Sequence, residues 1–241
     1  MKTIIKQIHH RRHLLFLDLE GTQFSHEMIA FGAIKTTLKP DGSIARTYKG
    51  IKRYVKPKNT IGNFVTKLTG ITKEMLAEQG ITYAQALTDI KNYCGPHFSK
   101  MAFVTFGTHD VRIFMQSLVY SPNADEAVAK HIAKHHLDMS SLLGQFIRDD
   151  KNNPLSLANY LKVFGRQFEG TSHDPLDDAK NLIAIYKDCF VKKDIIFDEY
   201  LKVLAQMRHL PEPLTKTLNA LLSGESVSAE EFRNYVKDYL G

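Results

Sequence analysis

The chain has few of the features that mark secreted, zinc-binding or membrane proteins. Its 241 residues include two cysteines, Cys94 and Cys189, and no CxxC pair, which suits a reducing compartment and argues against a disulfide scaffold or a zinc site. The opening residues 1–13 are basic and hold no apolar stretch, so we expect neither a signal peptide nor a membrane span. These observations predict a cytoplasmic protein.

The sequence also lacks a linker, an internal repeat and a low-complexity tract. No segment rich in proline, glycine or serine divides it, and its length is enough to bury one good core. The net charge of +6 and the isoelectric point near 9.1 suit a polyanionic partner. A modest basic excess is also common in proteins that never bind nucleic acid, so composition leaves the function open.

Two acidic residues stand at the end of an apolar run that covers residues 14–20. Such a run is typical of a buried strand, and side chains alternate along a strand, so Asp18 and Glu20 share one face. Two carboxylates on one face repel each other and lose hydration unless a cation lies between them. The alternative is that the strand has already ended and both acids are solvated.

A second acidic cluster begins a helix far along the chain. Asp174 has the position of an N-cap, Pro175 suits the first helical residue, and Asp177 fits a capping arrangement, so neither of these acids needs a ligand role. That leaves His173 just outside the helix and Asp178 one turn inside it. Asp178 lies on the flank of a buried stripe and needs a partner, whereas His173 alone is typical of a surface loop.

A third acid follows an apolar strand that ends in Phe106 and Gly107. Asp110 opens the amphipathic segment 111–119, and the simplest interpretation makes it the N-cap of a helix. Capping a helix does not exclude binding a metal ion through a water molecule. Each of the three motifs is therefore weak when taken alone.

In their order and settings, the three motifs resemble the DEDDh 3′–5′ exonucleases, the superfamily of the polymerase proofreading exonuclease, oligoribonuclease and ribonuclease T. The matching residues are Asp18-Leu19-Glu20-Gly21-Thr22, Phe106-Gly107-x-x-Asp110 and His173-x-x-x-x-Asp178-Ala179. Weaker matches at residues 27–34 and at the "GIT" turn of residues 68–72 extend the resemblance to about residues 12–190. The details look closest to KapD-like bacterial exonucleases and to the histone-mRNA exonuclease group.

The chain departs from the family pattern at three places. Gly21-Thr22-Gln23 replaces the more usual Thr-Thr-Gly after the second acid, so the loop that meets the terminal nucleotide differs in detail. Phe106 stands where relatives often carry tryptophan, a residue this chain lacks. Asp174 stands where the other branch of the superfamily has tyrosine, which favours the histidine branch. None of these changes removes a catalytic group.

The resemblance implies a catalytic site and a set of substrate contacts. Asp18, Glu20, Asp110 and Asp178 would hold two Mg²⁺ or Mn²⁺ ions, and His173 would be the general base. The residues expected to contact the substrate are Gly21, Thr22, Phe24, Phe106 and Gly70. Phe24, Phe64 and Phe106 are candidates to stack on terminal bases, although we favour core packing for each.

The expected reaction is release of nucleoside monophosphates from the 3′ end of single-stranded nucleic acid, with a slight preference for RNA. One alternative is a proofreading or trimming exonuclease that acts on DNA. The alternative from another class is a regulatory or nucleic-acid-binding protein that keeps the fold without turnover. The presence of all five catalytic residues argues against it, because a binding protein has no need of His173.

The pattern predicts an α/β protein with the ribonuclease H-like fold: a three-strand antiparallel meander, then parallel strands, with helices on both faces. Strands are expected over 13–20, 26–36, 46–56, 101–106 and 134–138, and helices within 61–94 and over 110–119, 139–148, 155–163 and 175–190. Residues 46–58 are basic without an acid, and they either block edge pairing or bind a nucleic-acid backbone.

We expect a catalytic domain over 1–191 and a helical extension over 192–241. Apolar stripes predict two helices within 192–222, and the capping box Ser228-x-x-Glu231 predicts a third. About fifty residues form only a marginal domain alone, so we expect the extension to pack on the core. A homo-oligomer or a protein partner bound through these helices is the alternative.

Overall fold

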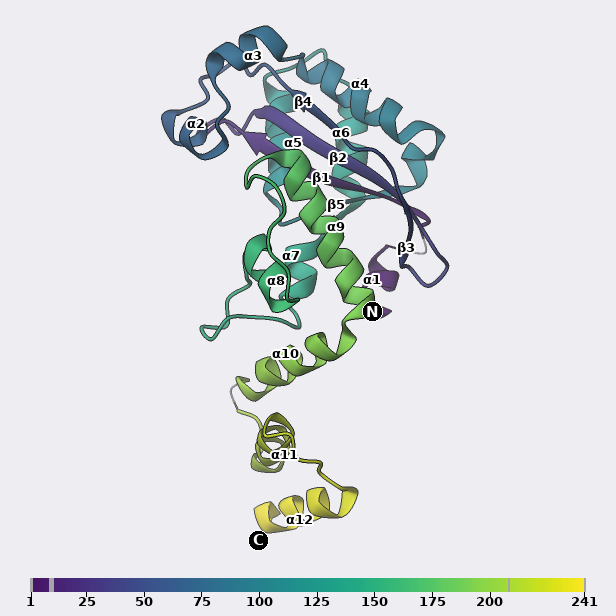
Figure 1. Cartoon of the computed structure of the whole chain (residues 1–241), viewed down its shortest axis with the longest axis vertical. Helices are drawn as coiled ribbons and strands as arrows, with labels where there is room; N and C mark the ends of the chain where they lie inside the picture. The colour runs from purple at the N-terminus through teal and green to yellow at the C-terminus, as the bar shows by residue number, and fades with distance from the viewer. Residues whose placement is uncertain (1, 9–10, 208, 241) are drawn as a thin grey trace.

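The computed structural model describes residues 2–8, 11–207 and 209–240 (Figure 1). The strands are β1 (His13–Gly21), β2 (Met28–Leu38), β3 (Ile44–Thr47), β4 (Ile51–Tyr54), β5 (Met101–Thr105) and β6 (His136–Asp138). They form one sheet in the order β3-β2-β1-β5-β6, with β4 also paired to β2. β2 is antiparallel to β1, β3 and β4, whereas β5 is parallel to β1 and β6, so the predicted mixed sheet is confirmed.

Helices cover both faces of the sheet (Figure 1). Those of the α/β part are α1 (Lys2–Gln7), α2 (Asn63–Thr69), α3 (Lys73–Gln79), α4 (Tyr83–Cys94), the 3-10 turn η1 (Gly95–Lys100), α5 (His109–Val119), α6 (Glu126–Lys134), α7 (Met139–Leu143), α8 (Leu157–Val163) and α9 (Pro175–Val191). Alternate residues of β1 enter two separate cores. Leu14 and Phe16 pack with the side chains of α7, α8 and α9, and Leu15 and Leu17 with those of α4, α5 and α6.

The prediction of a single strand over 46–56 at the edge of the sheet is wrong. The chain forms two short strands, β3 and β4, which pair with successive parts of β2. The break includes Gly50, where a β-carbon would lie 2.5 Å from the Leu176 side chain of α9. The strand is therefore interrupted where α9 approaches the sheet.

Two helices were not expected from the sequence. α1 precedes the first strand and buries Ile4 against the α9 side of the sheet. α6 begins after Asp125, whose side chain accepts a hydrogen bond from the backbone N–H of Val128. The cap and the apolar stripe of Val128, Ala129 and Ile132 were both visible in the sequence.

The chain continues into α10 (Lys193–Ala205), α11 (Glu212–Leu222) and α12 (Ala229–Leu240), which extend away from the sheet (Figure 1). α10 contacts α9 and buries Ile196 and Leu201. The expected capping box is present, because the Ser228 backbone N–H donates to Glu231 and the Glu231 N–H donates to the Ser228 hydroxyl.

α10 is the helix of the extension that contacts the core helix α9, and packing of the whole extension on the core stays a prediction. Pro213 is the one buried side chain among the described residues of α11 and α12. The domain boundary at residue 192 and a partner for these helices stay predictions. Within the part of the chain that the structure describes, none of the helices has the length and apolar character needed to cross a membrane.

Candidate active site

Asp18 and Glu20 lie where β1 leaves its parallel neighbour. β1 pairs with β5 only from His13 to Phe16, whereas its pairing with β2 continues to Gly21, with an irregularity after Glu20. Asp18 and Glu20 have the same parity along the strand as Leu14 and Phe16, so they belong to the face that α9 covers. The strand thus presents both carboxylates beyond the end of a buried core.

Asp178 comes to the same place from α9. Its side chain, 8% exposed, lies in the first turn of the helix, and α9 packs along β1 and β2. Carboxylate oxygens of Asp18, Glu20 and Asp178 all lie within 4.8 Å of one another. Two elements separated by more than 150 positions in the chain therefore build one acidic cluster.

The approach of α9 depends on Gly32 in β2, the residue opposite Asp18. A β-carbon at this position would lie 2.2 Å from the backbone carbonyl of Pro175, the first residue of α9. Any other residue would push the helix start away from the sheet. The position of Asp178 relative to β1 is therefore set by contact between backbones.

Asp110 is buried beside this cluster, and the N-cap interpretation of it is wrong. α5 begins at His109, preceded by Thr108, and Asp110 lies within the first turn. Its carboxylate accepts a hydrogen bond of 2.8 Å from the backbone N–H of Leu19, between the two acids of β1. Leu19 has no strand partner on that side, so Asp110 supplies the acceptor that a neighbouring strand would otherwise provide.

His173 lies at the rim of the cluster. Its backbone has a φ of 66°, in the left-handed region, and its side chain is 42% exposed. The Nδ1 atom is 3.8 Å from a carboxylate oxygen of Glu20. This histidine is therefore close to the acids and also accessible to solvent.

The capping residues behind His173 hold the start of α9. Asp174 accepts hydrogen bonds from the N–H groups of Leu176 and Asp177, as predicted, and also contacts the Lys52 ammonium at 2.5 Å. Asp177 accepts instead from the Thr171 N–H at 3.0 Å and pairs with a lysine one turn later. Both acids are thus occupied by structural contacts.

The four clustered acids are hard to ionise together. Burial, followed by repulsion from the neighbouring carboxylates, raises the pKa of Asp18 well above its usual range and that of Glu20 to about 8. Burial also raises the pKa of Asp110 to about 7 and that of Asp178 to about 6, although backbone hydrogen bonds oppose both increases. A cation among these oxygens would remove this cost, and carboxylates are the ligands that hard divalent cations prefer.

A cavity of about 470 Å³ opens in front of the acids. Its lining includes all five residues of the predicted catalytic set together with Gly21, Thr22 and Phe106. Two predicted substrate contacts are not part of it: Gly70 ends α2 in a left-handed conformation, and Phe24 lines a neighbouring hollow. The lining residues that were not expected are Leu19, Gln23, His26, Val65, Leu68, His109 and Leu157, together with Phe64, for which core packing had been favoured.

Two of the unexpected residues form a histidine pair. The rings of His26 and His109 meet edge to face with centroids 5.3 Å apart, and burial, then the neighbouring charges, lowers the pKa of His109. The position of His109 next to Asp110 was the sequence signal that could have identified this histidine as a site residue. Nothing local connects His26 with it, because the contact depends on how the loop after β1 folds.

The three phenylalanines differ in their surroundings. Core packing is the wrong expectation for Phe24 and Phe64, whose side chains are 76% and 61% exposed. Phe106 is partly buried and meets Tyr160 edge to face at 5.8 Å. Exposed aromatic rings beside a polar cavity are suited to stack on bases.

Comparison with solved structures agrees with this fold. The chain is similar to the nuclease domain of 3′hExo, described as a DEDDh family member bound to rAMP, with 21% identity and a TM-score of 0.62 over 76% of this chain and 94% of that one. Cell-death related nuclease 4 is 20% identical to this chain, with a TM-score of 0.61 over 76% of this chain and 65% of that one. E. coli Exonuclease I in complex with a dT13 oligonucleotide is 20% identical, with a TM-score of 0.58 over 79% of this chain and 43% of that one. The comparison with curated proteins finds no match.

A family model gives the assignment. The model described as exonuclease, RNase_T, matches residues 15–186, which is more than half of the chain and includes all three acidic motifs. The closer resemblance to KapD-like members stays a prediction. The chain therefore belongs to the exonuclease family and is a nuclease.

Proposed function

We propose that the protein is a two-metal-ion 3′–5′ exonuclease that releases nucleoside monophosphates from single-stranded nucleic acid. The observation that carries the proposal is the meeting of Asp18, Glu20 and Asp178, whose oxygens lie within 4.8 Å of one another in an open cavity. Asp110 and His173 line the same cavity. This set has the composition that hydrolysis of a phosphodiester requires.

Asp18, Glu20, Asp110 and Asp178 would hold two Mg²⁺ or Mn²⁺ ions. The donor set fits this role, because it consists of carboxylates alone, and burial together with repulsion from neighbouring carboxylates raises the pKa of each of them. When bound, paired divalent ions activate the attacking water and stabilise the leaving oxygen. Asp110 has an additional positioning role, because its bond to the Leu19 N–H fixes the strand between Asp18 and Glu20.

His173 would accept the proton of the attacking water. An imidazole changes its protonation near neutral pH, and this one lies at the cavity rim, where a proton can pass to solvent. The carboxylate of Glu20, 3.8 Å from Nδ1, stabilises the cation as it forms. The contact between Asp174 and Lys52 holds the segment that carries the histidine.

RNA is the substrate we favour, with DNA as the alternative. The preference rests on the resemblance to the histone-mRNA exonuclease group, and one structural neighbour is described as a 3′-exonuclease that recognises a histone mRNA stem-loop. A similar neighbour, Exonuclease I, is described with a DNA oligonucleotide. The ladder assay compares the two substrates directly.

The test uses 5′-labelled single-stranded RNA and DNA of equal sequence with Mg²⁺ or Mn²⁺. We expect a ladder that shortens from the 3′ end and is lost in Asp18→Asn and His173→Ala. Asp177→Asn is the matched control, because this acid neighbours Asp178 but its carboxylate binds the Thr171 N–H and Lys180. Metal-dependent thermal stabilisation without any ladder would favour the non-hydrolytic binding protein instead.

A further inference from the structure

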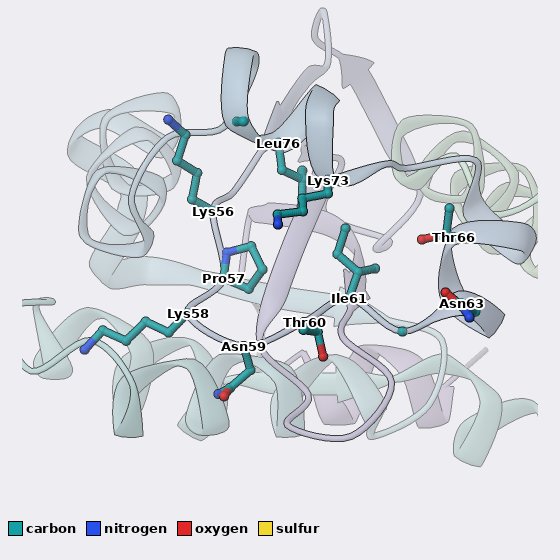
Figure 2. Close-up of a pocket in the computed structure, with 12 residues that line it drawn as sticks. Lys56, Pro57, Lys58, Asn59, Thr60, Ile61, Asn63, Thr66, Lys73 and Leu76 are labelled. Carbon is teal, nitrogen blue, oxygen red and sulfur yellow. The ribbon is translucent and has the colours of Figure 1, made fainter.

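A second pocket lies between residues 56–63 and the helices α2 and α3 (Figure 2). It has a volume of about 490 Å³, comparable with that of known small-ligand sites. Its lining residues are Lys56, Pro57, Lys58, Asn59, Thr60, Ile61, Gly62, Asn63, Thr66, Lys73, Leu76 and Ala77. No aspartate or glutamate is among them.

The pocket combines positive charge with an apolar floor. Lys56, Lys58 and Lys73 are exposed, and none of them makes an ion pair with a residue that the structure describes. In Figure 2 the Lys73 side chain points back toward Pro57 and Ile61, while the other two lysines extend outward from the rim. Unpaired ammonium groups beside an apolar surface suit a nucleoside phosphate, because the lysines meet the phosphate and the floor meets the base.

The lysine pocket, defined by these twelve residues, lies beside the catalytic cavity. Gln23 lines the catalytic cavity, and its backbone N–H donates to the carbonyl of Ile61, which lines the lysine pocket. The next two residues, Phe24 and Ser25, line an intermediate hollow of about 300 Å³. That hollow shares Asn59 and Thr60 with the lysine pocket.

A buried carboxylate connects the two segments that form this path. Glu27, 4% exposed, accepts hydrogen bonds from the backbone N–H groups of Lys58 and Asn59 at 2.7 and 3.0 Å and from the Ser25 hydroxyl at 2.9 Å. The N–H of Gln23 also donates to the Ile61 carbonyl at 2.8 Å. The loop after β1 that contains Gln23 and Ser25 and the segment from Lys58 to Ile61 are thus held in fixed relative positions before any ligand binds.

We infer that the lysine pocket binds a nucleotide of the substrate strand upstream of its 3′ end, and that the strand reaches it across Phe24. The inference rests on the proposed function and adds a second binding position to it. A free nucleotide has the same chemistry, but the direct contact between Gln23 of the catalytic cavity and Ile61 of the lysine pocket favours the strand itself. The lysines of this pocket would then act in substrate binding.

The test measures binding without cleavage. Fluorescently labelled single strands, from a dinucleotide to a dodecamer, are titrated with the full-length protein in the presence of a chelator. We expect affinity to increase stepwise once the strand is long enough to reach the lysine pocket. The double variant Lys58→Gln/Lys73→Gln should lose the step and lower the salt-dependence slope for long strands by about 1.4, for two lost phosphate contacts.

The control is Lys39→Gln/Lys151→Gln, which removes two exposed lysines outside the pocket and should keep the step. Phe24→Ala should selectively weaken the binding of long strands, because the Phe24 ring lines the intermediate hollow beside the lysine pocket. A step that survives in the pocket variant overturns the inference, as does equal weakening by both double variants. Lysine-dependent binding of AMP alone, without a length step, would reassign the pocket to a free nucleotide.

These outcomes are separable from those of the ladder assay. The binding series needs no turnover, so a protein that fails to hydrolyse RNA or DNA can still show the length step. Conversely, an active enzyme without the step would keep the proposed function and lose the lysine pocket as a substrate site.

Discussion

Metal binding at the acidic cluster should release protons, and the number follows from the pKa values. At pH 7 the metal-free protein keeps most of a proton on Glu20, whose pKa is about 8, and about half a proton on Asp110, whose pKa is about 7. Asp178, with a pKa of about 6, is mostly ionised, whereas burial and repulsion raise the pKa of Asp18 well above its usual range and can only add to the count. Because the bound form requires ionised carboxylates, saturation with Mg²⁺ or Mn²⁺ should release at least about 1.5 protons.

The same shifts make the metal-free protein less stable as the pH rises. The pKa values of these carboxyls are higher in the folded state than in the unfolded state. Their protonated forms therefore contribute their full stabilisation below the unfolded pKa, and this stabilisation is lost as the pH rises through the folded pKa values. With at least about 1.5 protons more on the native state near pH 7, the free energy of unfolding should fall by at least about 2 kcal/mol per pH unit. Saturating metal should largely remove this slope.

Calorimetric titrations in buffers of different ionisation enthalpy count the released protons, and urea unfolding with chelator between pH 6 and 8 measures the slope. Asp18→Asn should release fewer protons and be more stable than the wild type in chelator at high pH, because it relieves repulsion. Asp177→Asn should behave like the wild type in the proton count. Release of less than one proton, or a flat stability profile without metal, would refute the electrostatic argument.

Three further predictions concern residues that support the site. Gly32→Ala should destabilise the protein by about 3 kcal/mol in urea unfolding, because its β-carbon would lie 2.2 Å from the backbone of Pro175; an unchanged midpoint would contradict the close approach. Asp188→Asn should cost about 2 kcal/mol at pH 7, because the 3% exposed carboxylate meets Arg166 at 2.6 and 2.8 Å and the arginine is partly exposed. Burial raises the pKa of Asp188, but the hydrogen bonds and positive charges of Arg166 and Lys192 together outweigh it and leave the pKa lowered, so the difference should shrink as the pH falls below about 4 in thermal melts. Asp110→Asn keeps an acceptor for the Leu19 N–H, so the melting temperature should be unchanged while activity falls at least about 100-fold. A fall in melting temperature that accompanies the loss of activity would make the residue merely structural.

Local pattern was sufficient for the parts of the site that one element determines. Period-two alternation placed Asp18 and Glu20 on one face, and helix-capping rules identified the roles of Asp174 and Pro175. The meeting of the three motifs was expected only through the family resemblance. Spacing along the chain cannot reveal that α9 crosses the carboxyl end of β1.

The misses have physical reasons of the same kind. Asp110 has the sequence position of a cap, but the end of the β1–β5 pairing leaves the Leu19 N–H free, and that donor binds the carboxylate. The edge strand breaks in a segment that includes Gly50, where a β-carbon would lie 2.5 Å from the Leu176 side chain of α9. The lysine pocket combines residues 56–63 with α3, which no periodicity connects.

The contact between Gly32 and the start of α9 also determines where this protein can change. No side chain separates the two backbones, so repacking of hydrophobic residues cannot move Asp178 relative to β1. Variation in substrate choice is therefore confined to segments that border the cavity without supporting it, such as the loop after β1 and α2. Libraries for altered selectivity should be built at those positions, because most variants with substitutions at the junction of helix and sheet would be inactive.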